Sequence, residues 1–290
     1  MPFHFSDAFA ESLLLEDCPY GDLTTDVLGI GGASGRMSFS PRAPRCTVSG
    51  IALAAKILRK AGLEAQELLE DGSLAEGCPC LLAASGRASG LHRAWKTAQN
   101  VLEYMTGIAT RTAQLMENAR RARPDIAVAV TRKNFPGAKL MCLAAATDGG
   151  ASVHRAGLSE SVLVFDRHML FLEGEDKIRA LKERLPLMRA KAPEKRLVAE
   201  ASTLEEASRL AAIGLDAIQL DKFSPADLAQ ACRIIRQTSP GTLVLAAGGI
   251  NASNAYETAL QGPDVLVTSW VYFGKPQDIK VDFERAAQGA

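Results

Sequence analysis

The sequence has no net charge and few histidines, and each shortage argues against a class of protein. It contains 33 Lys and Arg against 33 Asp and Glu, which gives a formal net charge of +0 and a pI near 6.9. A chain without net positive charge lacks the field that holds nucleic acid or an anionic membrane surface. With only 4 histidines, we expect no metal site built from several imidazoles.

The chain also lacks long apolar runs and paired cysteines. Its longest apolar run, Leu140–Ala146, is far too short to cross a bilayer. Asp7 and Glu11 interrupt the N-terminal stretch, so a secretory signal peptide is not expected. Among the 6 cysteines, Cys78 and Cys80 are separated by one proline, which is the wrong spacing for a common zinc knuckle. We therefore expect reduced structural thiols and a cytoplasmic protein.

From Ile126 onward, short β-branched or apolar runs alternate with helical stretches. This alternation predicts βαβ units and a parallel sheet. The units follow one another without a long break, which favours a closed or nearly closed barrel over an open doubly wound sheet. The expected strands are Ile126–Thr131, Ser161–Asp166, Arg196–Ala201, Ala217–Asp221, Thr242–Gly248 and Val265–Ser269. The expected helices include Asp176–Ala190, Leu204–Ile213, Pro225–Gln237 and Ala252–Gln261.

The first part of the chain, residues 1–113, does not follow this rhythm. A helix is expected over Ile51–Lys60, and a long amphipathic helix from about Leu91 to Met105, with Gly107 as its stop. We therefore expect a separate N-terminal α/β domain over 1–113, a barrel domain over 114–270, and a segment, 271–290, that returns to the N-terminal domain. Short strand-like segments surround the first helix, at Gly35–Ser40, Cys46–Ser49 and Pro79–Ser85.

Cationic side chains lie near the ends of the first two expected barrel strands. In parallel α/β folds the chemistry occurs at the carboxyl ends of the strands. Thr131, Arg132 and Lys133 end the first strand, and His154 and Arg155 shortly precede the second. Each cluster could bind an anion, or it could be a solvated turn, and the residues alone leave both interpretations open.

Carboxylates and glycines end the later strands. Glu200 and Asp221 each follow an apolar run, where a carboxylate is costly unless it is paired, hydrogen-bonded or metal-bound. They could hold sugar hydroxyls, with or without Mg²⁺ bridging to phosphate, or form an ion pair with a neighbour such as Lys222. Gly248 and Gly249 open either a phosphate-binding turn before a helix or a tight turn with a helix cap. Together these residues suit a phosphorylated sugar and an anionic second substrate.

A set of motifs in a fixed order and spacing runs along nearly the whole chain. The motifs are Glu16-Asp17, Gly21–Thr25, Thr106–Thr110, Thr131–Lys133, Pro136-Gly137, Gly149-Gly150, His154–Leu158, Asp166 with His168, Glu200, Leu220-Asp221 and Gly248–Ile250. This set resembles that of the quinolinate phosphoribosyltransferase family.

The resemblance implies a type II phosphoribosyltransferase with an N-terminal α/β sandwich and an open α/β barrel. It implies a pentosyltransferase of the carboxylating nicotinate-nucleotide diphosphorylase kind, which transfers phosphoribosyl from PRPP to quinolinate in NAD biosynthesis. Pyrophosphate and CO₂ are released, and Mg²⁺ accompanies the PRPP. It also implies a homodimer with shared active sites.

The resemblance further implies roles for individual residues. Glu200, Asp221 and Lys133 would be catalytic. Glu200 and Asp221 would hold the ribose hydroxyls and, through PRPP, the Mg²⁺, and Gly248 and Gly249 would hold the 5′-phosphate. The acceptor carboxylates would be bound by Arg132, Lys133, His154 and Arg155. The other substrate-binding positions would be Lys96, Thr131, Phe165, Ala247, Thr268 and Ser269.

Four of these positions depart from the family pattern. Lys96 stands where the family has an arginine, and it cannot offer a bidentate fork to a carboxylate. Phe165 replaces a lysine, Ala247 replaces a serine, and a family glycine falls at Thr268 or Ser269. These changes are similar to those of the ModD branch, whose pyrophosphorylase-like members are associated with molybdenum-transport operons.

The leading hypothesis is therefore a transfer of phosphoribosyl from PRPP to quinolinate or a related carboxylate-bearing acceptor. The alternative is a molybdenum-handling binding or regulatory protein that uses the same anion pocket without turnover. A weaker alternative is an aldolase-like barrel in which Lys133 forms a Schiff base.

Overall fold

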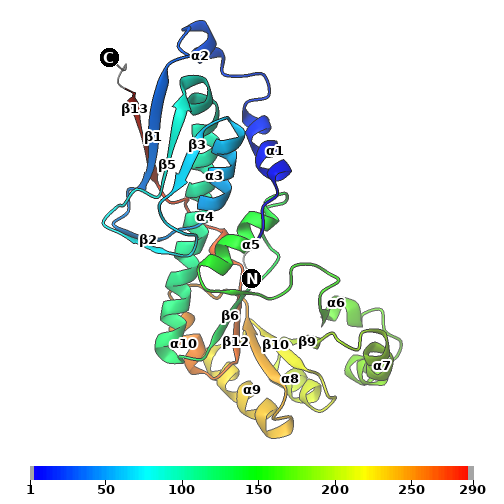
Figure 1. Ribbon diagram of the computed structural model, residues 1–290. Helices are drawn as coiled ribbons and strands as arrows, with labels where there is room; N and C mark the ends of the chain where they lie inside the picture. Colours follow the sequence, from blue (N-terminus) through cyan, green and yellow to red (C-terminus); the bar gives the residue numbers. More distant parts are fainter. Residues whose placement is uncertain (1–2, 287–290) are drawn as a thin grey trace. The chain divides into compact units, whose positions relative to one another are not determined.

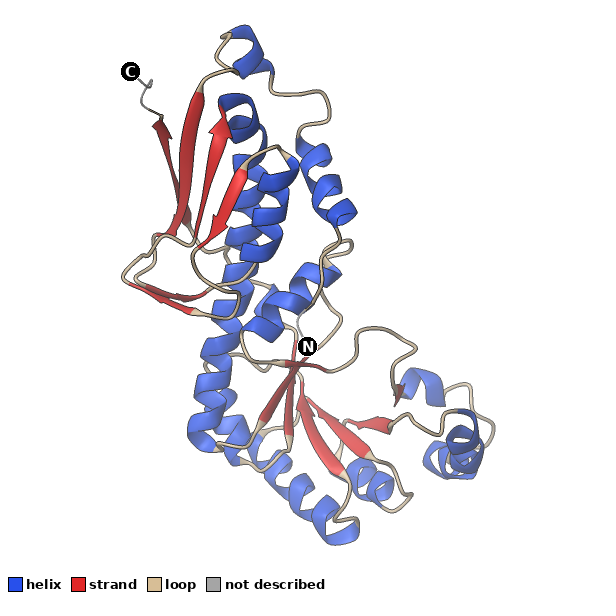
Figure 2. Cartoon of the chain, in the orientation of Figure 1, coloured by secondary structure: helices blue, strands red, loops and turns tan. Residues whose placement is uncertain are grey.

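The computed structural model describes residues 3–286, and the chain divides into two compact units (Figures 1 and 2). One unit, called the sandwich unit here, comprises Met1–Ala113, Pro136–Gly150 and Gly274–Ala290. The other, called the barrel unit, comprises Gln114–Phe135 and Ala151–Phe273. Each unit is described by itself below.

The sandwich unit is built on a 4-stranded antiparallel sheet with strand order β13-β1-β5-β3. On β1, Met37 and Phe39 point to the core while their neighbours are more exposed. The helix α3 lays an almost wholly apolar face against the sheet, as its burial pattern shows. The elements are α1 (Asp7–Asp17), α2 (Leu23–Val27), β1 (Ser34–Pro41), β2 (Arg45–Thr47), α3 (Ile51–Lys60), β3 (Glu64–Glu67), β4 (Leu74–Glu76), β5 (Leu82–Arg87), α4 (Ala88–Ala122, of which residues 114–122 belong to the barrel unit), α5 (Lys139–Asp148) and β13 (Ile279–Arg285).

The long helix α4 continues past the stop expected at Gly107 and ends at Ala122, so that expectation was wrong. A side chain at position 107 would lie 3.1 Å from the backbone nitrogen of Gln277 and 3.1 Å from the carbonyl oxygen of Lys275. Glycine is therefore present because another segment passes close to the helix, and not because the helix ends there.

One segment lies in a different unit from the one expected from the sequence. Residues 136–150, expected within the barrel domain, belong to the sandwich unit, where the Ser49 hydroxyl donates to Asp148 Oδ2 at 2.5 Å. A side chain at Gly149 would approach the carbonyl oxygen of Ala109 to 2.5 Å, so only glycine allows this contact. Near the end of the chain, β13 pairs antiparallel with β1.

The barrel unit contains a 7-stranded parallel sheet with strand order β7-β6-β12-β11-β10-β9-β8. The sheet is curled, and its edge strands β7 and β8 do not pair with each other, so it forms the open barrel of the expected fold class. Helices line its outer face (Figure 1). The elements are β6 (Ala127–Val130), β7 (Ser152–Val153), β8 (Val162–Val164), α6 (Asp166–Met169), α7 (Lys177–Lys191), β9 (Leu197–Ala201), α8 (Leu204–Ala211), β10 (Ala217–Asp221), α9 (Pro225–Thr238), β11 (Leu243–Ala247), α10 (Ala255–Leu260), β12 (Val265–Thr268) and the 3₁₀ turn η1 (Trp270–Tyr272).

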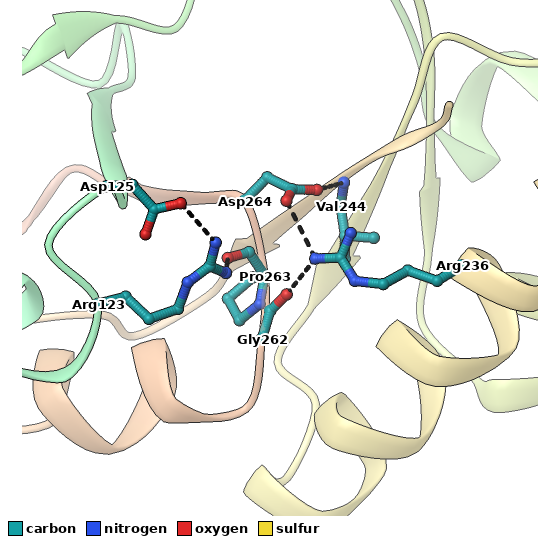
Figure 3. A network of polar contacts seen from close by, with 7 residues as sticks. All are labelled: Arg123, Asp125, Arg236, Val244, Gly262, Pro263 and Asp264. Atoms are coloured by element: carbon teal, nitrogen blue, oxygen red, sulfur yellow. Dashed lines mark hydrogen bonds and ion pairs between the residues drawn. The ribbon is translucent and has the colours of Figure 1, made fainter. Parts of the chain in front are cut away.

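Aspartate–arginine ion pairs lie at the amino ends of these strands, and Figure 3 shows those around Asp264 and Asp125. Asp264, directly before β12, accepts from the backbone N–H of Val244 at 2.8 Å and from Arg236 at 3.0 Å. Asp216, directly before β10, repeats the arrangement with the N–H of Leu197 at 2.6 Å and with the Arg189 guanidinium. The polar groups at this edge therefore satisfy one another and stabilise the sheet.

No helix within residues 3–286 is long and apolar enough to cross a membrane. The 6 cysteines all lie in this range and none forms a disulfide.

Candidate functional site

A pocket of about 860 Å³ opens in the barrel unit at the carboxyl ends of the strands. This is the edge at which parallel α/β sheets carry their chemistry. It brings together all but one of the site residues expected from the sequence, namely Thr131, Arg132, Lys133, His154, Arg155, Phe165, Glu200, Asp221, Ala247, Gly248, Gly249, Thr268 and Ser269.

The remaining expected residue, Lys96, lies on α4 in the sandwich unit. Its ammonium donates to Gln99 Oε1 at 2.7 Å and lies 4.4 Å from the centre of the Trp95 ring.

Arg155 is the most deeply buried cation of the pocket, with 7% of its surface exposed. No carboxylate of residues 3–286 forms an ion pair with it. Its guanidinium carbon lies 5.7 Å from the centre of the Phe165 ring, and burial, aided by the Arg132 charge, lowers its pKa. An arginine in this setting is poised for an anion that the pocket itself does not supply.

The loop after β6 and the strand β7 position the other cations. The backbone N–H of Lys133 donates to Thr131 Oγ1 at 3.2 Å, and Thr131 itself is tied to the Thr268 carbonyl at 2.9 Å. The N–H of His154 donates to the Val130 carbonyl at 3.0 Å. Burial and the neighbouring Arg155 lower the pKa of His154, which favours the neutral imidazole.

Glu200 and Asp221 lie on the adjacent strands β9 and β10. Burial raises the pKa of Glu200, and the charges of Asp221 and Asp166 raise it further. Gln219 opposes this shift, because its Nε2 donates to Glu200 Oε2 at 2.6 Å. Asp221 has a neighbour at 3.8 Å in Lys222 Nζ, but the lysine side chain is 79% exposed, so this ion pair is loose and contributes little.

The glycine turn after β11 is required by the backbone around it. Gly248 has φ +93°, and a side chain there would lie 2.7 Å from the nitrogen of Lys222 and 2.9 Å from Asp221 Oδ1. Gly249 also has positive φ, at +72°, but faces open space. The turn can therefore bring backbone close to a ligand.

The helix expected from Ala252 begins only at Ala255. The backbone N–H of Asn251 is already bound to Asn254 Oδ1 at 2.9 Å, and that of Ser253 to Asn251 Oδ1 at 2.8 Å. These two N–H groups are therefore not available for an anion.

Several pocket residues were missed by the sequence interpretation. Gln219 carried a signal, since it is a polar residue inside the apolar stretch Ile218–Leu220. Trp270 and Phe273 carried no such signal, because their place in the pocket depends on tertiary structure. The missed residues are Leu163, Arg167, Gln219, Val267, Trp270 and Phe273, whereas Asp166, Lys222 and Ile250 were named in the sequence but given no place in the site.

The fold and the pocket define an α/β-barrel protein with a polar site at the carboxyl edge of its strands. Residues 22–106 match the N-terminal domain of quinolinate phosphoribosyl transferase, and residues 108–282 match its C-terminal domain. The chain belongs to the quinolinate phosphoribosyltransferase family, as the motifs indicated.

Relatives with two kinds of name are similar to this chain in sequence. A protein of Escherichia coli O6:H1 (strain CFT073), provisionally named pyrophosphorylase ModD, is 38% identical over 283 residues, covering 97% of this chain and 98% of that protein. A protein of Methanocaldococcus jannaschii, provisionally named nicotinate-nucleotide pyrophosphorylase (carboxylating), is 28% identical over 274 residues, covering 93% and 94%.

Solved structures share the fold. The nicotinate-nucleotide pyrophosphorylase from Francisella tularensis is similar with a TM-score of 0.86 at 20% identity, covering 97% of this chain and 98% of that one. NadC from Streptococcus pyogenes has a TM-score of 0.85 at 22% identity, covering 97% of both chains.

Proposed function

We propose that this protein transfers the phosphoribosyl group of PRPP to a carboxylate-bearing heteroaromatic acceptor and releases pyrophosphate. One observation carries the proposal: a single pocket is lined by the buried Arg155, which has no carboxylate partner within residues 3–286, by the carboxylates of Glu200 and Asp221, and by a glycine turn. A ligand with separate anionic ends and a hydroxylated centre matches that order of groups. The family to which the chain belongs supports this reaction class.

The donor would lie along the strands β9, β10 and β11. Glu200 and Asp221 would accept hydrogen bonds from the ribose hydroxyls. Gly248 and Gly249 would hold the 5′-phosphate through a close approach of their backbone. Arg132 and Lys133, which follow β6, would attract the pyrophosphate.

The residues present suit Mg²⁺ that arrives with PRPP. Within residues 3–286 no group of three His, Cys, Asp or Glu side chains could hold a metal alone. Mg²⁺ is commonly held by one or two carboxylates together with substrate phosphates, and Glu200 with Asp221 would supply them. The ion would neutralise charge on the pyrophosphate.

In the transfer, the ring nitrogen of the acceptor forms a bond to C1 of the ribose with its own electron pair. The bond from C1 to the pyrophosphate oxygen breaks, and pyrophosphate leaves with that electron pair. Positive charge grows on the ribose ring between these events, and the carboxylates Glu200 and Asp221 stabilise it. Holding both substrates in one pocket supplies the rest of the rate through orientation.

The acceptor would bind at Arg155 and His154. A charge-assisted hydrogen bond to its carboxylate would be worth about 1.5–3 kcal/mol, and binding would remove the cost of an unpaired buried guanidinium. Phe165 offers this acceptor an apolar face and no charge.

The working protein would be a cytoplasmic homodimer with shared sites. Lys96, which does not line the pocket of its own chain, would reach the pocket of a partner subunit.

The test is turnover. Purified protein is incubated with Mg²⁺, PRPP and a panel containing quinolinate, nicotinate and related acids, and released pyrophosphate is measured. We expect acceptor-dependent release. Tight molybdate binding that PRPP does not displace, with no release for any acid, would instead favour a molybdenum-handling binding protein.

A further inference from the structure

Gln219 is a buried amide of the pocket with an unused carbonyl oxygen. It is 6% exposed and lies opposite Glu200 in the register of β10 and β9. Its Nε2 donates to Glu200 Oε2 at 2.6 Å, whereas its Oε1 is buried and accepts no hydrogen bond within residues 3–286. The side chain lines the pocket.

Apart from Glu200, the neighbours of Gln219 give its carbonyl oxygen nothing to bind. Along the same sheet face, the next residue of β10 toward the amino end, Ala217, belongs to an apolar cluster with Leu163, Val198, Leu245 and Val267. Leu245 pairs with Gln219 across the strands. A buried carbonyl oxygen without a partner costs about 1–3 kcal/mol, and a methionine or leucine would avoid that cost. The amide oxygen is therefore available for a ligand.

A count of donors indicates which ligand meets it, and this step rests on the proposed function. The two ribose hydroxyls of PRPP offer one O–H donor each. Glu200 and Asp221 take both of them. With both hydroxyls assigned to Glu200 and Asp221, Gln219 Oε1 in the same pocket is left for a donor on the acceptor substrate.

An aromatic ring, that of Phe165, lines the pocket at the end of β8. Phe165 directly follows β8, in line with Glu200 on the adjacent strand β9. Its backbone N–H donates to His168 Nδ1 at 2.9 Å, and the two rings stack with centres 5.6 Å apart and planes at 23°. Arg155 lies against the same ring. The row from Arg155 to Gln219 thus presents a cation, an aromatic ring and an amide oxygen.

We infer that the acceptor is a flat heteroaromatic acid that carries an N–H or O–H donor besides its carboxylate and its nucleophilic ring nitrogen, and that Gln219 Oε1 accepts this hydrogen bond. Gln219 is then a specificity residue. Ionised quinolinate and nicotinate have no such donor and leave the amide oxygen unpaired. An acceptor with a ring amino group satisfies it.

The experiment compares acids of equal size that differ only in the donor. The 2-, 5- and 6-amino derivatives of nicotinate are assayed beside the corresponding methyl derivatives, and kcat/KM for pyrophosphate release is measured. We expect kcat/KM for at least one amino-substituted nicotinate to exceed that of the corresponding methyl-substituted nicotinate by about tenfold, which corresponds to about 1.4 kcal/mol. In Gln219→Met that preference falls to about onefold, and each methyl derivative serves as the internal reference for any change in PRPP binding that follows from losing the hydrogen bond to Glu200.

Each other result overturns the inference in a distinct way. Equal rates for every amino and methyl pair in the wild type would do so without any variant, and with the phosphoribosyltransferase function intact. If the preference persists in Gln219→Met, with or without a loss of PRPP affinity, Gln219 Oε1 does not bind the donor group of the acceptor. Failure of the wild type to bind PRPP would instead refute the proposed function.

Discussion

Arg155 shows how a single buried residue can indicate a ligand. Its guanidinium is 7% exposed, lies against Phe165 and has Arg132 close enough to lower its pKa. Both neighbours leave the charge uncompensated, since a ring face attracts a cation only weakly and Arg132 repels it. An arginine kept in this state lowers the stability of the empty pocket and strengthens the binding of an anion.

Replacing this arginine therefore has opposite effects on binding and stability. Arg155→Met should weaken the binding of nicotinate and quinolinate about 10- to 100-fold, the equivalent of about 1.5–3 kcal/mol. The thermal midpoint should stay the same or rise, because an unpaired buried charge is removed. Calorimetric titration and thermal unfolding measure the two effects. The control Arg179→Met, which removes an exposed arginine paired with Glu183, should leave acid binding unchanged.

In the sandwich unit, Asp148 is a half-buried carboxyl with an unusual titration. Burial raises its pKa to about 6, the Asp71 charge adds to the shift, and the Ser49 hydroxyl opposes it. A carboxyl whose pKa is higher in the folded chain than in the unfolded chain stabilises the fold at pH values below its pKa in the unfolded chain. That contribution is lost as the pH rises through about 6.

Asp148→Asn should remove this loss. The variant and the wild type should unfold at similar temperatures at about pH 4, and the variant should be more stable at about pH 7.5 by about 1 kcal/mol, or about 2–4 °C. The figure is below the full linkage value because the group is partly solvated. Thermal unfolding across this pH range is the measurement. The exposed Asp17→Asn serves as control, and a pH-independent difference for Asp148→Asn would contradict the account.

At the scale of elements, the two ends of the barrel strands do different work. The amino ends carry Asp216 and Asp264, which are fully engaged with backbone N–H groups and with arginines from α7 and α9. The carboxyl ends carry an unpartnered guanidinium, a raised carboxyl pKa and an unpaired amide oxygen. Satisfied polar groups stabilise, whereas unsatisfied ones are available to a ligand.

The turn after β11 provides a matched pair of glycine substitutions. Gly248→Ala places a methyl group against Lys222 and Asp221, so it should displace the β10 loop, lower the thermal midpoint and weaken PRPP binding by at least about tenfold. Gly249→Ala also has positive φ but meets no atom within 4 Å, so it should cost only about 1 kcal/mol of stability. Calorimetry with PRPP and thermal unfolding distinguish them. Equal effects of the two variants would count against the close approach.

The elements that could be predicted from the sequence are those with a strong local pattern. The helix α3 and the strand β10 have the expected bounds, because apolar periodicity and flanking turns specify both. The strands β3 and β4, which are largely exposed, and the two-residue β7 gave no such pattern. The length of α4 could not be deduced either, since Gly107 serves a tertiary contact.

The candidate site was predicted as a set of strand ends, and the rest of it depends on tertiary structure. Parallel strands bring their carboxyl ends to one edge, so Arg155, Glu200 and Gly248 could be expected together. The contacts of Phe165 with His168 and of Gln219 with Glu200 depend on rotamers and register. Trp270 and Phe273 were missed because a 3₁₀ turn carries them to the pocket.

For the whole molecule, a net charge of +0 conceals a concentrated local charge. The pocket gathers Arg132, Lys133, Arg155, Arg167 and Lys222 against three carboxylates, those of Asp166, Glu200 and Asp221. A chain of zero net charge with a cationic pocket suits a small, highly charged substrate and disfavours a polyanion. PRPP with Mg²⁺ is a substrate of this kind.

The central claim is that this pocket binds PRPP with Mg²⁺, and calorimetric titration of the intact protein tests it most directly. The account predicts saturable binding that requires Mg²⁺ and that weakens by at least about tenfold in the double variant Glu200→Gln, Asp221→Asn. Absence of saturable binding in the wild type, or equal binding by the double variant, would contradict it.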